Sequence, residues 1–253
     1  MTAVRYELRD GIAWLTIDRP EARNSLNREV RAGLFEGARR FAADDDARVL
    51  VLTGSGTKAF CAGGDLAEMS AEGLTIPPPD YVPQFGRNIQ VDKPTIAAVN
   101  GAAFAGGFLL AQSCDLCVAA TTATFAISEV RVGRGAPWAA PLAQMIPRRI
   151  AMELLLTGRP LTADRAYDIG FVNRLAEPDR LLEVAGELAA QIAGNAPLSV
   201  LAGKRTAGLT AELPLSAAFD EAEQLWAPVY TSGDAQEGMR AFVEKRTPVW
   251  RGH

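Results

Sequence analysis

The feature that most limits the fold is a run of 21 residues without a charged side chain, from Pro94 to Cys114. Such a run is long enough to span a bilayer. However, Asn100-Gly101 and Gly106-Gly107 interrupt it with residues typical of turns. We therefore predict a buried strand over 94–99, a turn, and a buried helix over about 106–112. No membrane partner is expected from this pattern.

The segments before residue 138 predict an α/β core. Short strands are predicted over 4–9, 11–18, 48–54, 94–99, 115–120 and 124–127. Asp10-Gly11 is expected to turn the first two into a hairpin. A helix is predicted over 28–42, with Asn27 as its N-cap. The segment 71–86 holds three consecutive prolines and is expected to be a loop over the active site or the surface.

After residue 138 the pattern becomes mainly helical. Helices are predicted over 151–156, 162–168, 178–193, 196–209, 215–230 and 234–246, and one strand over 171–175. Thr162 and Ser216 are the expected helix caps. No linker separates the two parts. We therefore expect an α/β core over 1–195 followed directly by a helical region over 196–253.

Charge and residue counts exclude several classes of function. The net charge of −4 gives no basic surface for a nucleic-acid partner. The single histidine is the last residue, His253, so neither a Ser-His-Asp triad nor a histidine-ligated metal site is expected. Cys114 and Cys117 lack a second pair to complete a zinc site, which favours a buried strand. An odd cysteine count and no signal-peptide pattern favour a reducing, cytoplasmic compartment.

Two glycine-rich turns, over 54–66 and 99–108, are the candidate chemical machinery. Glycine lets backbone approach a ligand closely, and the N–H groups at a helix start are unpaired. Two such N–H groups aimed at one point would form an oxyanion hole. Neither turn matches a P-loop or a dinucleotide-binding fingerprint. Gly106-Gly107 could also serve only to allow tight packing, and the spacing leaves this alternative open.

Several further motifs accompany these turns: Asp18-Arg-Pro20, Asn24-Ser-Leu26, the segment 58–66, Lys93-Pro94, Asn100-Gly101, Ala105-Gly-Gly107, Cys114-Asp115, Phe125, Glu129, Gly133, and the segments 153–158, 170–173 and 237–242. Together they resemble the enoyl-CoA hydratase/isomerase (crotonase) family over essentially the whole chain. The resemblance implies a spiral of ββα units followed by a C-terminal helical trimerisation region. It also implies an acyl-CoA substrate, no cofactor beyond the coenzyme A of that substrate, and a homotrimer or hexamer.

The resemblance also implies roles at the reacting centre. Gly64 and Gly106 would supply the oxyanion-hole N–H groups, and Glu129 would be the acid/base. Hydratases of the family carry a second glutamate three residues past the oxyanion glycine, where this chain has Leu109. Because leucine cannot hydrogen-bond a water, a reaction with one acid is favoured, most simply the 1,3-proton shift of double-bond isomerisation. The competing interpretation of Glu129 is an ordinary solvated surface charge.

The remaining substrate contacts are carried over by position: Ala22, Arg23, Lys58, Ala62, Asp65, Leu66, Leu109, Trp138, Phe242 and Lys245. Ala22 and Arg23 would line the channel for pantetheine and adenine. Lys58 would lie near a phosphate, and the segment with Phe242 and Lys245 would reach the nucleotide, often in an adjacent subunit. The two lysines could equally be solvated surface charges.

The segment 133–141 departs from the glycine-rich pattern of the family. Pro137, Trp138 and Pro141 should make this wall of the acyl pocket stiffer and bulkier. Arg131 and Arg134 could reach a polar or carboxylated acyl group, or could be surface arginines.

Three other functions stay open at this point. A hydratase could replace its missing acid by water or by a nearby group such as Asp65, Glu68 or Asp80. A non-catalytic subunit could bind acyl-CoA without turnover if Glu129 pointed away from the pocket. A decarboxylase or hydrolase could use the same oxyanion hole, which serves any thioester enolate or tetrahedral intermediate.

Overall fold

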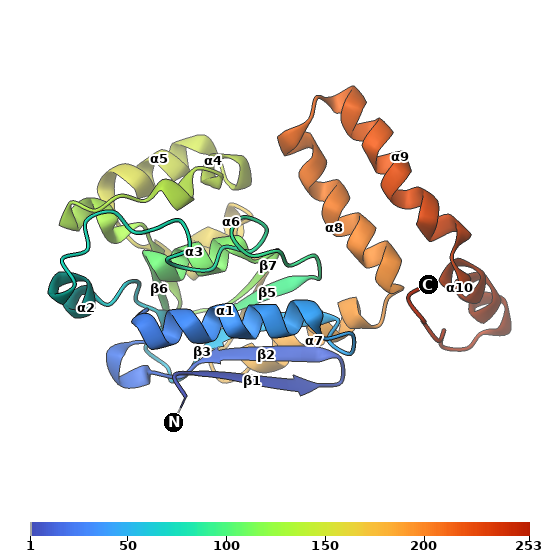
Figure 1. Ribbon diagram of the computed structural model, residues 1–253, viewed down its shortest axis with the longest axis horizontal. Helices are drawn as coiled ribbons and strands as arrows, with labels where there is room; N and C mark the ends of the chain where they lie inside the picture. Colours follow the sequence, from blue (N-terminus) through green and yellow to red (C-terminus); the bar gives the residue numbers. More distant parts are fainter. Residues whose placement is uncertain (1) are drawn as a thin grey trace.

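The computed structural model describes residues 2–253, and its strands form two sheets (Figure 1). In this part of the chain the larger sheet has six strands, in the order β1 (Val4–Arg9), β2 (Ile12–Ile17), β3 (Val49–Gly54), β5 (Thr95–Val99), β7 (Leu116–Ala120) and β10 (Arg174–Ala176). The smaller sheet has four, in the order β4 (Ala59–Cys61), β6 (Ala102–Phe104), β8 (Thr124–Ala126) and β9 (Leu161–Thr162).

Successive strands alternate between the two sheets. β3, β5 and β7 join the larger sheet, while β4, β6 and β8 join the smaller one. Helices α2 (Leu66–Ala71) and α3 (Gly106–Ser113) precede each return to the larger sheet. From β5 to β8, each strand pairs in parallel with the corresponding strand of the previous unit. This is the predicted spiral of ββα units, and the α/β fold class is confirmed.

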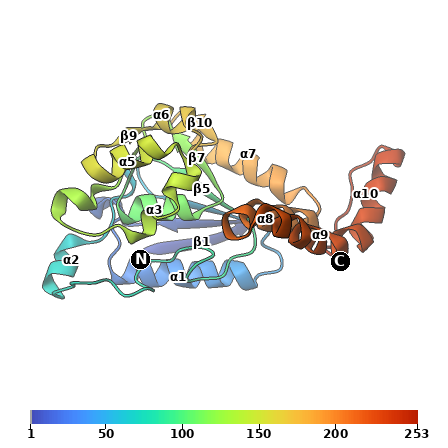
Figure 2. The same cartoon turned by 90° about the horizontal axis from the view of Figure 1, so that it is seen from above.

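The middle of the larger sheet is buried on both faces. Every residue of β3 and of β5 is buried, as continuous apolar strands require. Helix α7 (Leu181–Ala193) packs against these strands, and α1 (Arg28–Ala43) packs against β1 and β2 (Figure 2). Asn27 caps α1 as predicted, because its side chain accepts from the Val30 N–H at 2.9 Å. The predicted hairpin over β1 and β2 is also confirmed.

The uncharged run folds into β5, a turn, β6 and α3. The predicted strand and helix are therefore confirmed, but the sequence pattern missed the short strand β6 between them. No helix within residues 2–253 is long and apolar enough to cross a membrane.

The second half is mainly helical. Its further helices are α4 (Leu142–Met145), α5 (Arg148–Thr157), α6 (Ala163–Asp168), α8 (Pro197–Glu212), α9 (Leu215–Thr231) and α10 (Gly233–Glu244). Thr162 caps α6 as predicted. Ser216 as a cap was wrong, because the extended backbone of Pro214 already precedes the first turn of α9. The predicted strand over 171–175 begins later and is the short β10.

Helices α8, α9 and α10 extend away from the two sheets (Figures 1 and 2). α8 and α9 pack against each other as a helical hairpin. This arrangement agrees with a C-terminal helical region, while the division of the chain at residues 195 and 196 stays a prediction.

Candidate active site

The three candidate catalytic residues follow three neighbouring strands of the smaller sheet. Gly64 comes after β4, Gly106 after β6, and Glu129 after β8. β6 lies between β4 and β8 and pairs in parallel with both. Adjacent parallel strands end at the same edge of a sheet, about 4.8 Å apart. The topology therefore delivers the three residues to one edge, the usual place for a ligand in open α/β sheets.

The N–H of Gly64 points away from the backbone of Leu26, with which Gly64 forms a parallel bridge. The Leu26 N–H donates to the Gly63 carbonyl at 2.8 Å, and the Asp65 N–H donates to the Leu26 carbonyl at 3.5 Å. In such a parallel bridge, the N–H of the middle residue faces the opposite side. Within residues 2–253 no group accepts from the Gly64 N–H. This N–H is therefore available to a ligand.

Gly106 is the first residue of α3, so its N–H has no acceptor within the helix. Ala105 before it has φ +51° and ψ −117°, a conformation that non-glycine residues rarely adopt. This turn brings the start of α3 against the first glycine-rich turn. A Cβ added to Gly63 would lie 2.8 Å from the Ala105 Cβ and 3.4 Å from the Gly106 nitrogen. The two turns are thus in contact.

Gly107 lies in close contact with β4, the strand before Gly64. A Cβ at this position would lie only 2.0 Å from the Cys61 carbonyl oxygen. Gly107 is therefore required for tight packing of α3 against β4, whereas the N–H of Gly106 remains unpaired. An added Cβ at Gly106 would lie 2.7 Å from the Leu26 Cδ1, so both glycines allow close packing, and Gly106 in addition presents an unpaired N–H.

Glu129 lies in a short 3₁₀ turn, η2 (Ser128–Val132), and is only 9% exposed. The indole N–H of Trp138, from the next 3₁₀ turn η3 (Pro137–Ala139), donates to its Oε1 at 2.9 Å. The other oxygen, Oε2, is buried and has no hydrogen-bond partner. Burial raises the pKa of Glu129, although its own backbone N–H and the Trp138 indole oppose the rise. One oxygen is thus fixed and the other is available for proton transfer.

Leu109 is 5% exposed and lies on α3, one turn past Gly106. The aromatic rings of Phe108 and Trp138 meet edge-on nearby, with centroids 5.9 Å apart. Phe108 also packs against Phe125 and Phe171. Leu109 itself belongs to the buried apolar core, at the position where hydratases of the family carry a second carboxylate.

Two of the three acids that could replace the second carboxylate, Asp65 and Glu68, form ion pairs with arginines. Asp65 caps α2 and pairs with Arg19 at 2.6 Å, and this hydrogen bond lowers its pKa. Glu68 pairs with Arg31 at 2.8 Å. Burial raises the pKa of Glu68, but the Arg28 backbone N–H and the Arg31 guanidinium leave it lowered. Asp80 is exposed.

Asp65 and Glu68 are therefore held in their ionised forms by arginines, which does not suit a proton donor.

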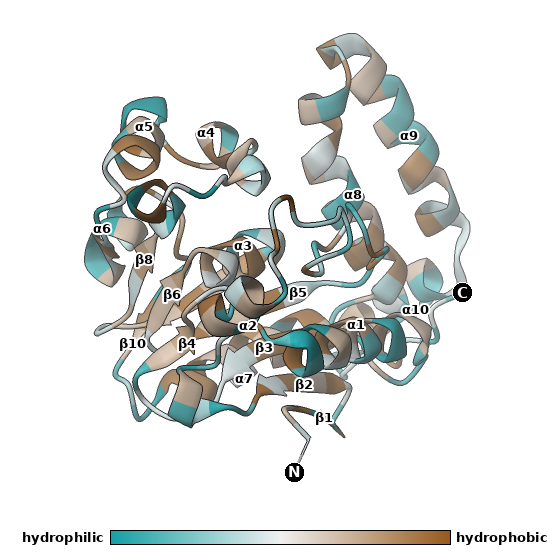
Figure 3. Ribbon diagram, turned by 60° about the vertical axis from the view of Figure 1, so that its left-hand side comes forward, coloured by the Kyte–Doolittle hydropathy of each residue, from teal (hydrophilic) through white to brown (hydrophobic). Residues whose placement is uncertain are grey.

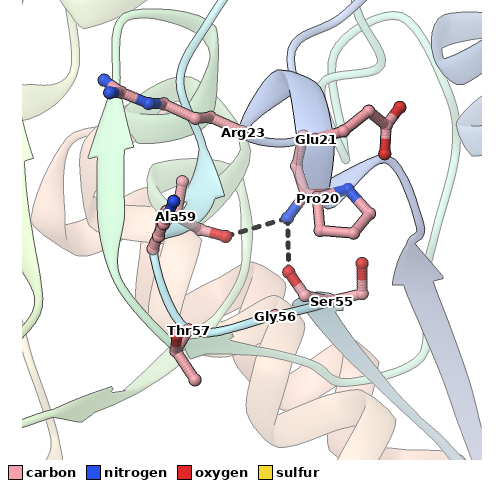
Figure 4. Close-up of a pocket in the computed structure, with 9 residues that line it drawn as sticks. Pro20, Glu21, Arg23, Ser55, Gly56, Thr57 and Ala59 are labelled. Atoms are coloured by element: carbon pink, nitrogen blue, oxygen red, sulfur yellow. Dashed lines mark hydrogen bonds between the residues drawn. The ribbon is translucent and has the colours of Figure 1, made fainter.

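A cleft of about 320 Å³ opens beside the first turn (Figure 4). Its lining includes Arg23 and Lys58, and the Arg23 carbonyl accepts from the Ala62 N–H at 3.1 Å. The Asn24 amide braces one side by donating to the carbonyls of Ser55 and Ala59, at 3.0 and 2.8 Å. The cleft thus carries two exposed cations, and the hydrogen bond between Arg23 and Ala62 connects its wall to the segment that carries Gly64. Ala22, in the 3₁₀ turn η1 (Pro20–Ala22), lies next to it in the chain.

Three of the predicted contacts do not line this cleft. Leu66 begins α2, and its side chain is largely exposed. Phe242 on α10 is 86% exposed, and Lys245 follows at the end of that helix. Figures 1 and 2 place α10 at the opposite end of the molecule from α2. Within one chain, Phe242 and Lys245 are therefore not brought to the site, and a contribution from a neighbouring subunit stays a prediction.

Two residues at the site were missed by sequence reasoning. Gln112 donates from its Nε2 to the Trp138 carbonyl at 2.9 Å, one turn beyond Leu109 on α3. Met69 on α2 lies against Gly64, where an added Cβ would be 2.7 Å from its Sδ. The positions of Gln112 on α3 and Met69 on α2 could have indicated that each side chain faces the glycine-rich turn before its helix. No sequence pattern identified the residues that they contact.

Comparison with known proteins identifies the family. The sequence model described as enoyl-CoA hydratase/isomerase matches residues 7–253. The (E)-benzylidenesuccinyl-CoA hydratase of Thauera aromatica is 38% identical, with 98% of this chain and 99% of that protein covered. The carnitinyl-CoA dehydratase of Salmonella typhi is 38% identical over 94% of each chain.

The solved structures agree. The enoyl-CoA hydratase EchA1 of Mycobacterium marinum superimposes with a TM-score of 0.92 at 42% identity, over 100% of both chains. An enoyl-CoA hydratase of Mycobacterium tuberculosis H37Rv gives the same TM-score at 41% identity, also over 100% of both chains. The chain therefore belongs to the enoyl-CoA hydratase/isomerase family, and it is an acyl-CoA enzyme of that family.

Proposed function

We propose that the protein transfers a proton at the α-carbon of an acyl-CoA thioester, with Glu129 as its single acid/base. The thioester oxygen would accept hydrogen bonds from the N–H groups of Gly64 and Gly106 and carry the negative charge of the enolate. The observation that carries this proposal is the unpaired, buried Oε2 of Glu129. Its raised pKa lies closer to neutral pH, which suits a group that must both take and return a proton.

The net reaction that best fits one acid is a shift of the double bond. Glu129 takes a proton from the α-carbon of a 3-enoyl thioester, and the electron pair delocalises toward the thioester oxygen. The same proton then returns at the γ-carbon, which gives the 2-enoyl thioester. No water is added or lost, so the absence of a polar group at Leu109 is no obstacle.

Hydration or dehydration is the second candidate, because the relatives compared above are named hydratases or a dehydratase. In this chain such a reaction would have to activate water with Glu129 alone. Asp65 and Glu68 support it poorly, since both are already paired with arginines.

Two absorbance assays decide between these reactions. Conversion of 3-hexenoyl-CoA, or of its analogue with a terminal carboxylate, to the conjugated 2-enoyl thioester raises the ultraviolet absorbance. Hydration of crotonyl-CoA, or of its carboxylated analogue, lowers it. We expect isomerisation that Glu129→Gln abolishes. Rapid hydration without isomerisation would overturn the proposal in favour of the second candidate.

Coenzyme A would occupy the cleft of Arg23 and Lys58, and it would enter as part of the substrate without a separate cofactor. Neither side chain forms an ion pair within residues 2–253, so both cations are available to phosphates. The predicted cytoplasmic location is also retained as a proposal, supported by cysteines that are all free and buried within the described chain.

We also propose that the chain forms a homotrimer through its C-terminal helices. The apolar side chains of Phe219 and Tyr230 on α9 are 64% and 73% exposed, beside a groove that Trp226 also lines. In Figure 3, α9 alternates between hydrophobic and hydrophilic stretches. Sedimentation should give a trimer or hexamer, and Phe219→Glu should shift it toward the monomer. A parent protein that is monomeric at micromolar concentration would contradict this assembly.

A further inference from the structure

Arg134 is a partly buried cation that no acid neutralises. Its Nη1 donates to the Leu74 carbonyl at 2.9 Å, while its Nη2 is buried and has no acceptor. No carboxylate within residues 2–253 lies within ion-pair distance of it. Arg19 and Arg31 differ, because each pairs with a carboxylate at 2.8 Å or less. A desolvated guanidinium nitrogen without an acceptor is unfavourable unless a ligand supplies one.

The contacts of Arg134 connect the segment of Glu129 to the segment that follows α2. Its backbone N–H donates to the Glu129 carbonyl at 2.9 Å, and its side chain reaches Leu74 on the opposite segment. The Leu74 N–H in turn donates to the Met69 carbonyl at 2.9 Å, and the Met69 sulfur lies against Gly64. A continuous chain of contacts therefore connects Gly64 to Glu129 through Arg134.

The loop over 71–86 contributes a second polar group near this arginine. Burial raises the pKa of Tyr81, and the positive charge of Arg134 is among those that oppose the rise. The Tyr81 hydroxyl accepts from Arg31 at 3.0 Å and keeps its own hydrogen for another acceptor. Among residues 2–253, the Arg134 guanidinium forms no hydrogen bond or ion pair with the Glu129 carboxylate, and it reaches the Leu74 carbonyl instead.

We propose that Arg134 is a specificity-determining residue that binds a carboxylate at the far end of the acyl group. The preferred substrates are then CoA monothioesters of dicarboxylic acids. This inference rests on the proposed function, because it assumes that the acyl group extends from Gly64 past Glu129. A carboxylate matches the planar guanidinium and satisfies the buried Nη2 by a charge-assisted hydrogen bond. Its distal position keeps the second negative charge away from the enolate.

Binding of saturated thioester pairs tests this assignment without relying on turnover. Succinyl-CoA, glutaryl-CoA and adipoyl-CoA are each compared by calorimetry with butanoyl-CoA, pentanoyl-CoA and hexanoyl-CoA, which end in a methyl group instead. At one or more chain lengths, the carboxylated thioester should bind about tenfold more tightly, or better. Arg134→Met should bring this ratio close to one and change binding of the methyl-ended partner by less than about threefold. Arg134→Lys should retain part of the ratio.

Arg131→Met is the matched control, because Arg131 is exposed and its stem lies against Gly158. It should leave the ratio unchanged. A ratio near one at all three lengths in the parent protein would overturn the proposal, and so would an unchanged ratio in Arg134→Met. A preserved ratio with no proton exchange at the α-carbon would instead contradict the proposed function alone.

Discussion

The indole N–H of Trp138 donates to Oε1 of Glu129 at 2.9 Å and leaves Oε2 unpaired. The two oxygens of this carboxylate therefore differ: Oε1 is held by a hydrogen bond, and Oε2 is free to exchange a proton. Gln112 extends this arrangement by fixing the Trp138 carbonyl at 2.9 Å. Trp138 thus holds the carboxylate that we propose as the base.

Trp138→Phe tests this positioning role. The indole bond favours the carboxylate form, so its loss should raise the pKa of Glu129 further. The acid limb of the rate profile for α-proton exchange should then move to higher pH, with the rate below that limb falling about fivefold. Phenylalanine keeps a ring against Phe108. Trp14→Phe, on β2, is the control and should leave the profile in place; an unchanged profile in Trp138→Phe would exclude the role.

The same pKa has a consequence for stability. A carboxyl group with a raised pKa binds its proton more tightly in the folded state than in the unfolded state. Its contribution to the free energy of unfolding is therefore present below the usual glutamate range and is lost as pH rises through the folded pKa. Glu129→Gln should consequently be more stable than the parent at pH 8 by about 0.5–2 kcal/mol. This gain should shrink toward pH 4 in urea unfolding, whereas a gain that is the same at both pH values would argue against burial of a titrating carboxyl.

Leu109→Glu tests why the chain lacks a second acid. A carboxylate at this position should create a water site shared with Glu129 and raise the rate of crotonyl-CoA hydration roughly 10²-fold. It should also lower the free energy of unfolding by roughly 1–3 kcal/mol, because a charge enters an apolar site. Leu109→Gln has a similar shape without the charge and should gain little activity. The idea fails if the parent already hydrates crotonyl-CoA as fast as Leu109→Glu.

The sequence motifs identified the glycine turns and Glu129, but not the reason why they meet. Strands β4 and β6 have three residues each, which is too short for a periodic pattern to be recognised. Their pairing depends on strands far apart in the chain. The hydrogen bond from Trp138 to Glu129 depends in the same way on how η3 folds back over η2, and no local signal predicts it. The burial of β3 and β5, in contrast, follows directly from their continuous apolar sequences.

Ala105→Gly tests the strain in the second turn. Alanine at φ +51° and ψ −117° is costly, and glycine adopts that conformation readily. The substitution should raise the free energy of unfolding by about 1 kcal/mol after the added flexibility of the unfolded chain is counted. Proton exchange should be unaffected, because the Gly106 N–H is kept. Ala102→Gly, on β6, is the control and should be destabilising; equal destabilisation of both variants would show that Ala105 is not strained.

Arg23→Gln and Lys58→Gln test the cleft as the coenzyme A site. Each should raise KM for a CoA thioester about threefold at low salt, with kcat unchanged, because only phosphate contacts are lost. A thioester of N-acetylcysteamine has no phosphates, and its KM should not change. Arg180→Gln removes an exposed cation that pairs with Glu183 on α7 and serves as the control. Equal effects on both thioesters would place the phosphates elsewhere.

The most direct measurement is solvent deuterium exchange at the α-carbon of a bound saturated acyl-CoA, followed by mass spectrometry. A panel of methyl-ended and carboxylated thioesters makes the result independent of the acyl preference. If Glu129 is the single acid/base, the parent protein exchanges this proton and Glu129→Gln does so at least about 10²-fold more slowly, with binding affinity largely retained. Exchange by Glu129→Gln at the rate of the parent would contradict the assignment.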